Sequence, residues 1–246
     1  MNFSVGIIFG NNYPNTTYQL DGCVNDALAM ERLLKEELLF NDVHVYTEAT
    51  GTTLYRTVLE AVRRTNVQKV DNLWIHFSGH ATQVPSKDNY ESDGLDECIV
   101  PSDYRRVGVL RDNFFLSAFK RVHPQTNVFC TFDCCHSGTI ADIKYAYVKS
   151  NFDDPVITHS GIPCEARVLC VSGCRDAEKA KEALGSGIMT KCLVEIVRAK
   201  GAFVPLRTLI DSLRVAVQRE NPAQYPVLSS SKRLGPEDTL LQIKPI

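Results

Sequence analysis

Short apolar segments of strand length alternate with amphipathic helical segments along most of the chain. The strand-like segments are four to six residues long, and they occupy 5–9, 43–46, 72–77, 127–132, 167–171 and a short stretch near Val227. The helical segments repeat apolar residues every three or four positions, and they occupy 24–38, 53–65, 113–122, 187–199 and 206–218. This alternation predicts parallel strands joined by crossover helices. The expected fold is therefore α/β, with a mainly parallel sheet between two layers of helices.

The chain is expected to form one domain. Its 246 residues are 44% hydrophobic, which is enough apolar material for one large core, and no repeat or Pro/Gly/Ser-rich linker divides it. The segment 143–165 has no clear periodicity and contains prolines and a glycine. We expect it to be a surface loop that connects 1–142 to 166–246 within a single domain, 1–246.

Composition and motifs exclude several classes of function. The 27 basic and 29 acidic residues are interspersed, so no basic surface for nucleic acid or for anionic membranes is expected. The start of the chain lacks the features of a signal peptide, and no apolar run is long enough for a membrane span. Nine cysteines without a C-x-x-C pair favour reduced thiols and a cytoplasmic location. "FGNNYPN", after the first strand, is not a glycine-rich phosphate loop, which disfavours a flavodoxin-like domain and an organic cofactor.

Two polar loops follow neighbouring strand segments and contain reactive side chains. "SGHATQ" (78–83) follows the strand at 72–77, and "DCCHSG" (133–138) follows the strand at 127–132. Ligands of open parallel sheets bind at the carboxyl ends of the strands. A cysteine nucleophile needs a base within hydrogen-bond reach and N–H donors for the oxyanion. We therefore interpret Cys135 as the nucleophile and His80 as the base, with the amides of Gly79 and Cys135 as oxyanion donors.

Other interpretations of these loops are weaker. A cysteine after an apolar strand is most often a small buried hydrophobic residue. His76 and His80 have the H-x-x-x-H spacing of a helical zinc motif, but "LWIHF" is typical of a strand and no acidic residue lies in the motif. His76 is therefore expected to pack inside the sheet. His136 adjoins Cys135, and neighbours on a turn point apart, which makes His136 a poorer base than His80.

The motifs of the chain resemble those of metacaspases, which belong to the caspase-like cysteine peptidases. The matching segments run in family order over nearly the whole chain: "VGIIFGNNYP", "LDGCVNDALAM", "WIHFSGHATQ", "ESDGLDECIVPSD", "VFCTFDCCHSGT", "VLCVSGCRDAEKAKE" and "GIMTKCLVEIV". His80 and Cys135 are 55 residues apart, close to the separation of about 50 known for caspases.

The resemblance implies a caspase-like α/β/α sandwich with His80 and Cys135 as the catalytic dyad. It also implies a monomer, and the short connection between the two halves resembles the compact type I arrangement. That type often has a pro-domain, but none is expected here because the first strand begins at Phe3. Cys134 is expected to be a packed neighbour rather than a second nucleophile. Metacaspases cleave after Arg or Lys, and the positions that match their specificity pocket are Cys23, Asp26, Ser78 and Asp133. Carboxylates in such a pocket would pair with a desolvated substrate cation.

Many metacaspases require calcium, and the resemblance implies a site for it. The matching positions are Asp96, Asp112, Asn113 and Asp142. The family commonly has consecutive acidic residues where this chain has Asp112 and Asn113, and Arg111 precedes them, so weak binding is expected. Self-cleavage is expected in the 143–165 segment, with Lys144 and Lys149 as candidate sites.

The sequence thus predicts a calcium-activated cysteine endopeptidase that acts on protein or peptide substrates with Arg or Lys before the cleaved bond. The main alternative is a non-catalytic caspase-like protein that binds partners through the same pocket. The presence of both His80 and Cys135 favours the enzyme.

Overall fold

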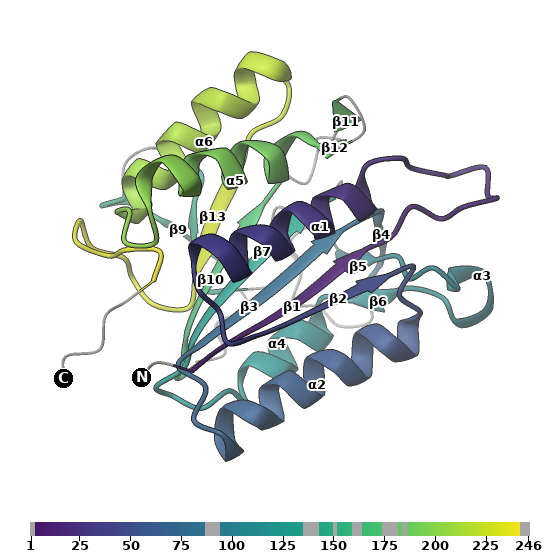
Figure 1. Cartoon of the computed structure of the whole chain (residues 1–246), viewed down its shortest axis with the longest axis horizontal. Coiled ribbons are helices and arrows are strands. Elements are labelled where there is room, and N and C mark those ends of the chain that lie inside the picture. Colours follow the sequence, from purple (N-terminus) through teal and green to yellow (C-terminus); the bar gives the residue numbers. More distant parts are fainter. Residues whose placement is uncertain are drawn as a thin grey trace.

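A computed structural model describes residues 3–86, 94–134, 143–149, 152–158, 164–173, 182–183 and 186–241. Its centre is an eight-stranded sheet with the strand order β2-β1-β3-β7-β10-β13-β8-β9 (Figure 1). The strands are β1 Ser4–Gly10, β2 Asp42–Thr47, β3 Asn72–Ser78, β7 Asn127–Asp133, β8 Tyr145–Tyr147, β9 Val156–Ile157, β10 Arg167–Ser172 and β13 Val227–Ser230. The expected α/β fold is confirmed.

The sheet is parallel in one part and antiparallel in the other. The pairs among β2, β1, β3, β7 and β10 are all parallel. β13 pairs antiparallel with β10, and β8 and β9 continue the antiparallel part. The carboxyl ends of the parallel strands therefore meet along one edge of the sheet, toward the right of Figure 1.

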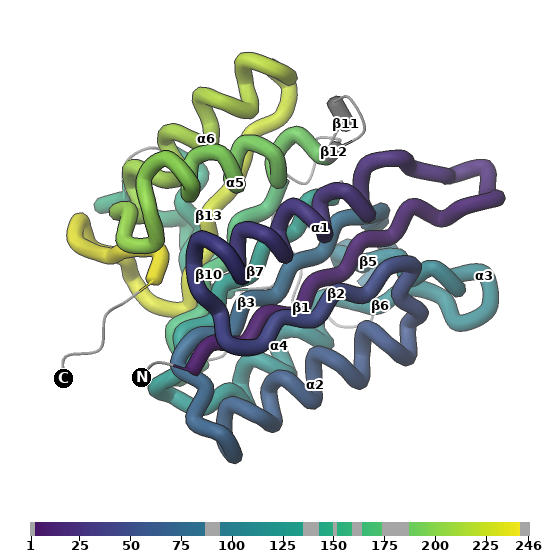
Figure 2. Tube along the Cα trace, viewed as in Figure 1, coloured from purple at the N-terminus to yellow at the C-terminus, as the bar shows by residue number. Residues whose placement is uncertain are grey.

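Helices cover both faces of the sheet, as Figures 1 and 2 show. One face carries α1 Cys23–Arg32, the π-helical turn η1 Leu33–Glu37, α5 Ile188–Lys200 and α6 Leu206–Glu220. The other face carries α2 Gly51–Val67 and α4 Asn113–Phe119. Each layer encloses its own apolar core with the sheet, one around Val58, Phe115 and Phe132, the other around Trp74, Met189 and Leu213.

Local sequence explains why these elements form. All seven residues of β1 are buried, as expected for a strand covered by helices on both faces. In α2, the buried residues Leu54, Val58, Ala61 and Val62 form one apolar stripe, and the Thr50 side chain accepts a hydrogen bond from Thr53 N–H at the start of the helix. These elements lie within a few residues of the bounds that periodicity predicts.

Two small sheets and a short helix were not predicted. β4 Ala81–Pro85, β5 Leu95–Ile99 and β6 Leu110–Arg111 form an antiparallel sheet, and α3 Tyr104–Val107 lies between β5 and β6. β11 Glu182–Ala183 pairs with β12 Ser186–Gly187 just before α5. β4 begins immediately after His80, so this small sheet adjoins the predicted site.

The segment 143–165 is not only a surface loop, as the sequence had suggested. β8 and β9 lie within it, and β8 pairs with β13 of the central sheet. Ala146 and Tyr147 of β8 are buried, and the Tyr147 hydroxyl accepts a hydrogen bond from Leu234 N–H over 2.7 Å. A three-residue strand has no detectable periodicity, so only its pairing partner reveals it.

None of the helices in the described ranges combines the length and the apolar character that crossing a membrane requires. The seven described cysteines are all free and buried. The expectation of reduced thiols stays a prediction.

Candidate active site

Strand pairing brings the two predicted loops together. Ser78 and Asp133 are the last residues of β3 and β7, and they lie opposite each other in the parallel ladder. Gly79 N–H donates to Asp133 O across the two strands, over 3.4 Å. His80 follows shortly after the end of β3, and Cys134 follows directly after the end of β7. Cys135, the predicted nucleophile, lies outside the described residues.

Two tyrosines hold His80, and sequence analysis missed both. The Tyr13 hydroxyl accepts from His80 N–H over 2.9 Å and donates to Val100 O over 2.7 Å, with the two rings 4.8 Å apart. Burial raises the pKa of Tyr13 well above its usual value, so the hydroxyl keeps its proton. His80 Nε2 lies 2.6 Å from Tyr18 O, and since a carbonyl can only accept, this ring nitrogen carries hydrogen. Both tyrosines lie in the aperiodic loop after β1. Tyr13 belongs to the matching segment "VGIIFGNNYP", which gives no role for its hydroxyl, and Tyr18 lies outside any matching segment.

Hydrogen bonding at Nε2 decides which nitrogen of His80 is available for chemistry. In a neutral imidazole one nitrogen donates and the other accepts. With Nε2–H directed at Tyr18 O, the lone pair lies on Nδ1. The described geometry thus gives His80 one defined tautomer, with Nδ1 able to exchange a proton.

Cys134 packs in the core rather than facing the site. Its side chain is buried among the residues on the α2 side of the sheet. Two other buried thiols stay protonated, because burial raises the pKa of Cys98 to about 12 and that of Cys192 to about 11. A thiol kept protonated is a poor nucleophile. These cysteines are therefore structural.

The predicted specificity residues converge on the start of α5. Asp26, on the first turn of α1, accepts from Ser78 Oγ–H over 2.6 Å and from Gly187 N–H over 2.9 and 3.0 Å. Asp133 accepts from Thr190 N–H over 2.8 Å. Asp26 is 1% exposed and Asp133 is 5% exposed. Two carboxylates from distant parts of the chain thus meet in a buried setting, at the edge of the sheet beside His80.

Gly187 is required where the two carboxylates approach. A Cβ atom at this position would lie 2.2 Å from Asp133 Oδ2 and 2.8 Å from Asp26 Oδ2, which no side chain can tolerate. Cys23, the fourth predicted pocket residue, is the first residue of α1, three positions before Asp26, and its side chain is buried. The helix start and the glycine together bring backbone N–H groups to the carboxylates.

One predicted oxyanion donor is engaged elsewhere. The Gly79 N–H points to Asp133 O, so it would have to exchange that bond for one to a substrate oxygen. The other donor, the Cys135 amide, lies outside the described residues. The oxyanion assignment stays a prediction.

Three of the four predicted calcium ligands lie close together around β5 and the start of α4, and Asp142 lies outside the described residues. Asp96 is 1% exposed, and its Oδ2 forms an ion pair with Arg111. Asp112 Oδ1 accepts from Asn113 N–H over 2.7 Å, and Asp112 Oδ2 accepts from Glu97 N–H over 2.9 Å. Asn113 is exposed. Asp112 therefore serves as the cap of α4, whatever else it binds.

These residues fit a divalent cation only in part. Asp96 Oδ1 is buried and has no hydrogen-bond partner among the described residues, so it could contact a cation. The Arg111 guanidinium already neutralises the same carboxylate. Among the described residues, no group of three His, Cys, Asp or Glu side chains has the arrangement of a metal site. Calcium binding stays a prediction, and the described residues supply only part of the predicted ligand set.

His76 packs inside the sheet, as expected. Its Nδ1 lies 2.8 Å from Thr131 Oγ1, and the residue is fully buried. Burial lowers the pKa of His76 to about 3, so the ring is neutral at ordinary pH. This histidine has a structural role.

The two predicted processing sites differ in accessibility. Lys144 is half-buried, and its carbonyl accepts a hydrogen bond from Thr158 N–H over 3.0 Å. Lys149 follows β8 and is exposed. Lys149 is the better placed of the two for cleavage.

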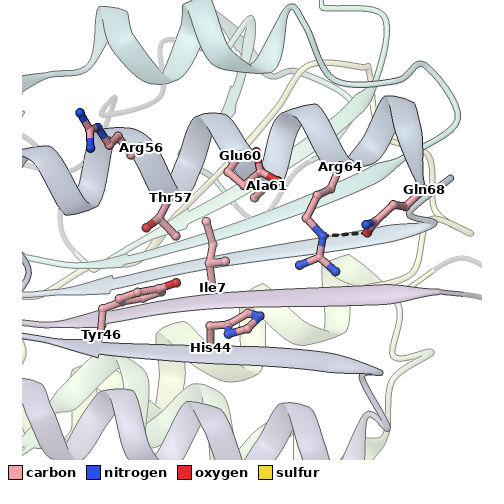
Figure 3. A pocket seen from close by; sticks show the side chains of 9 residues that line it. All are labelled: Ile7, His44, Tyr46, Arg56, Thr57, Glu60, Ala61, Arg64 and Gln68. Atoms are coloured by element: carbon pink, nitrogen blue, oxygen red, sulfur yellow. Dashed lines mark hydrogen bonds between the residues drawn. The ribbon is translucent and has the colours of Figure 1, made fainter.

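A surface pocket of about 490 Å³ lies between α2 and the β1–β2 edge of the sheet (Figure 3). It contains none of the predicted site residues. Two of its charged side chains bind neighbouring residues: Arg64 binds Gln68 and Asp42, and Glu60 binds Arg63. We interpret it as a solvated groove beside a helix.

The chain matches the family model described as Caspase domain over residues 4–235. Among curated proteins it is 27% identical to Metacaspase-2 of Trypanosoma brucei brucei, with 95% of this chain and 74% of that protein aligned. It is 35% identical to Metacaspase-7 of Arabidopsis thaliana over 55% of this chain and 35% of that protein. A further relative, 28% identical over 94% of this chain and 72% of its own length, is Inactive metacaspase-4 of Trypanosoma brucei brucei.

Solved structures share the fold. A crystallised protein from Geobacter sulfurreducens superposes with a TM-score of 0.71 at 21% identity, covering 99% of this chain and 98% of that one. The Drosophila initiator caspase Dronc superposes with a TM-score of 0.62 at 11% identity, covering 97% and 82%. The family model covers nearly the whole chain, and the metacaspase relatives and caspase-like neighbours agree with it. The chain belongs to the caspase domain family of cysteine peptidases.

Proposed function

We propose that this protein is a cysteine endopeptidase that cleaves after Arg or Lys, with Cys135 as nucleophile and His80 as base. The observation that supports this most directly is the meeting of Asp26 and Asp133 at the end of β3 and β7, beside the loop of His80. A buried pair of carboxylates next to the predicted dyad would bind a substrate cation there.

Peptide hydrolysis would follow the usual course of a thiol peptidase. The Cys135 thiolate attacks the carbonyl carbon, and the protonated His80 gives its proton to the leaving amine. Water then attacks the acyl-enzyme and releases Cys135. The hydrogen bond from Nε2 to Tyr18 O supports Nδ1 as the nitrogen that exchanges this proton, and Tyr13 holds the backbone of His80 in place.

Charge would govern substrate choice. A guanidinium or ammonium beside Asp26 and Asp133 forms charge-assisted hydrogen bonds, whereas a substrate carboxylate would be repelled. We therefore expect cleavage after Arg and Lys and none after Asp.

A panel of fluorogenic peptides that differ only in the residue before the cleaved bond tests this function. Activity should need Arg or Lys and should be lost in Cys135→Ala and His80→Ala. Cys134→Ala is the matched control, since that thiol packs in the core, and it should keep most of the activity. An inactive Cys134→Ala beside an active Cys135→Ala would contradict the assignment of the nucleophile.

A second candidate function is partner binding without catalysis. It is favoured by one observation, namely that a relative of similar identity is described as inactive. Alkylation by a peptide chloromethyl ketone with a terminal Arg separates the two functions. An enzyme should be labelled at Cys135, whereas a non-catalytic protein should bind Arg peptides without being labelled.

Calcium activation and self-cleavage belong to the same proposal. Calcium would bring positive charge to Asp96 and Asp112, and since Arg111 competes for Asp96, half-maximal activation is expected at high micromolar to millimolar concentration. Asp142→Ala should raise that concentration. Self-cleavage is expected after Lys149 in preference to Lys144, and mass spectrometry of active protein beside Cys135→Ala would detect it.

A further inference from the structure

Two fully buried polar side chains close to Asp133 have polar atoms without hydrogen-bond partners in the described structure. They are Thr190, whose Oγ1 has none, and Gln224, whose Oε1 and Nε2 both have none. Both residues are 0% exposed. Folded proteins keep few such groups, because a buried donor or acceptor without a partner is destabilising. Each therefore calls for a partner that binds there.

Both residues lie near the carboxylate of Asp133. Thr190 lies at Oδ2, to which its own N–H donates over 2.8 Å. Gln224 lies on the side of Oδ1, because a Cβ atom at Gly173 would be 3.1 Å from Asp133 Oδ1 and 3.4 Å from Gln224 Nε2. Gly173 follows β10 directly and bonds to Phe132 O, so this position is at the same edge of the sheet as His80.

The local backbone structure gives no reason for a buried side-chain amide at position 224. Its N–H donates to Asn221 O in the turn between α6 and β13, and this bond does not depend on the side chain. An apolar side chain of similar length would fill the same interior volume without an unsatisfied donor and acceptor. The amide is therefore better explained by a polar ligand than by packing.

We infer that Thr190 and Gln224 are specificity-determining residues of the Asp26–Asp133 pocket and bind the N–H groups of a substrate guanidinium that the carboxylates leave unpaired. This inference rests on the proposed function. A guanidinium has five N–H donors in a rigid plane, whereas an ammonium has three on a compact group. Thr190 Oγ1 and Gln224 Oε1 can accept from these N–H groups, whereas Gln224 Nε2 can only donate. Two extra neutral acceptors beside the carboxylates suit the guanidinium, so the enzyme prefers Arg to Lys.

The ratio of kcat/KM for matched Arg and Lys peptides measures this role. Gln224→Leu should lower kcat/KM for Arg peptides about tenfold, as expected for the loss of one hydrogen bond to a charged donor, and should change Lys peptides much less. Thr190→Val, which keeps the shape but lacks the hydroxyl, should lower the ratio in the same direction. Thr190→Ser keeps the hydroxyl and should keep the ratio.

Thermal unfolding distinguishes this role from a structural one. If Gln224 is kept for a ligand, Gln224→Leu should leave Tm unchanged or raise it, since an unpaired buried amide is removed. Thr126→Val is the control: Thr126 is equally buried but donates to Val70 O at the opposite end of the sheet. It should lower Tm and leave the Arg/Lys ratio unchanged.

Each outcome decides the inference. Suppose that the wild-type protein cleaves Arg and Lys peptides, and that Gln224→Leu and Thr190→Val keep the wild-type ratio of kcat/KM for Arg and Lys peptides. The inference is then wrong and the proposed function stands. Should wild type cleave neither peptide, the proposed function fails first. If Gln224→Leu does not fold, a packing role for its amide is supported against the inference, and the comparison of Thr190→Val with Thr190→Ser then decides for Thr190.

Discussion

The described part of the molecule contains two pairs of buried aspartates, and their described partners differ. Asp26 and Asp133 accept hydrogen bonds from a serine hydroxyl and from the backbone N–H groups of Gly187 and Thr190. Asp96 instead binds the guanidinium of Arg111, and Asp112 caps α4. Asp112 also accepts from the backbone N–H groups of Asn113 and Glu97, so the difference between the pairs lies at Asp96. Neutral donors orient a carboxylate and leave its charge in place, whereas the Arg111 guanidinium neutralises the charge of Asp96.

Under the proposed function, this contrast would separate a carboxylate pair that recognises substrate from one that serves mainly in folding. A carboxylate held by neutral dipoles still attracts a cation, and attraction is strong where water is excluded. A carboxylate that already has an internal cation contributes mainly to folding, and any metal must compete for it. Two sites with the same residue type should therefore respond in different ways to substrates, to calcium and to mutation.

The largest expected effect comes from removing charge in the first pair. Asp133→Asn should lower kcat/KM for Arg and Lys peptides by about a hundredfold or more, because a charge-assisted bond to the substrate is lost. Asp112→Asn is the matched control in the second pair and should lower Tm more than activity. If Asp133→Asn folds correctly and keeps near-normal kcat/KM for Arg and Lys peptides, Asp133 does not bind the substrate cation, and the proposed difference between the two pairs is wrong.

The next effect concerns the internal cation of the second pair. Arg111→Ala leaves Asp96 buried without its partner and should lower the free energy of unfolding by about 3 kcal/mol, the lower part of the range for broken buried pairs. Millimolar calcium should restore part of this loss and raise Tm more in Arg111→Ala than in wild type.

A control for Arg111→Ala lies on the surface. Arg106 pairs with Asp103 over 2.8 Å and is largely exposed, so Arg106→Ala should cost less than about 1 kcal/mol and should show no calcium response. Equal losses of stability for both variants would show that the Arg111 pair is no different from a surface pair.

His76 also makes the stability of the protein depend on pH. This contribution must be subtracted before acid unfolding is used to compare the two aspartate pairs. The unfolded chain protonates this histidine near pH 6.5, whereas burial lowers its pKa in the folded protein to about 3. Protons therefore bind the unfolded state preferentially, and the free energy of unfolding should fall by about 1.4 kcal/mol per pH unit as pH decreases from about 6 toward 4. Denaturant unfolding of His76→Gln should lack this contribution, and an unchanged slope would contradict it.

The smallest expected effect is at Asn113. Asn113→Asp places a carboxylate at the first residue of α4, and it should raise the free energy of unfolding by about 0.5 kcal/mol through the helix dipole. It should also lower the calcium concentration for half-maximal activity a few-fold, since another charged oxygen is present. Asn113→Gln, which keeps the neutral amide, should do neither. Calcium titrations of peptidase activity measure the difference.

Sequence periodicity predicted the elements whose burial follows a simple rule. The strands of the parallel core and the long helices each bury a regular set of side chains, so their position could be read from 5–9 or 206–218 alone. β5 escaped because its buried residues include Asp96 and Glu97, on opposite faces of the strand, which a hydrophobicity pattern assigns to solvent. Burial of such residues depends on Arg111 and Gln83, which come from other strands.

The site was predictable from motifs only where a motif contains the reacting group. His80 and the pocket aspartates follow from the resemblance, but Tyr13 and Tyr18 act through a hydroxyl and a backbone carbonyl that no pattern marks. Thr190 and Gln224 lie in ordinary amphipathic and turn sequence. Their place beside Asp133 results from how α5 and the end of α6 pack on the sheet, and residue spacing carries no information about it.

The antiparallel end of the sheet affects whether copies of the protein associate edge to edge in a concentrated solution. An exposed strand edge can recruit another chain by backbone pairing. Among the described strands, the outermost at this end is β9, and it is only two residues long. So short an edge offers few backbone groups for pairing, and β8 and β9 together separate the longer β13 from any neighbouring molecule. Growth of the sheet from molecule to molecule is therefore disfavoured at this end.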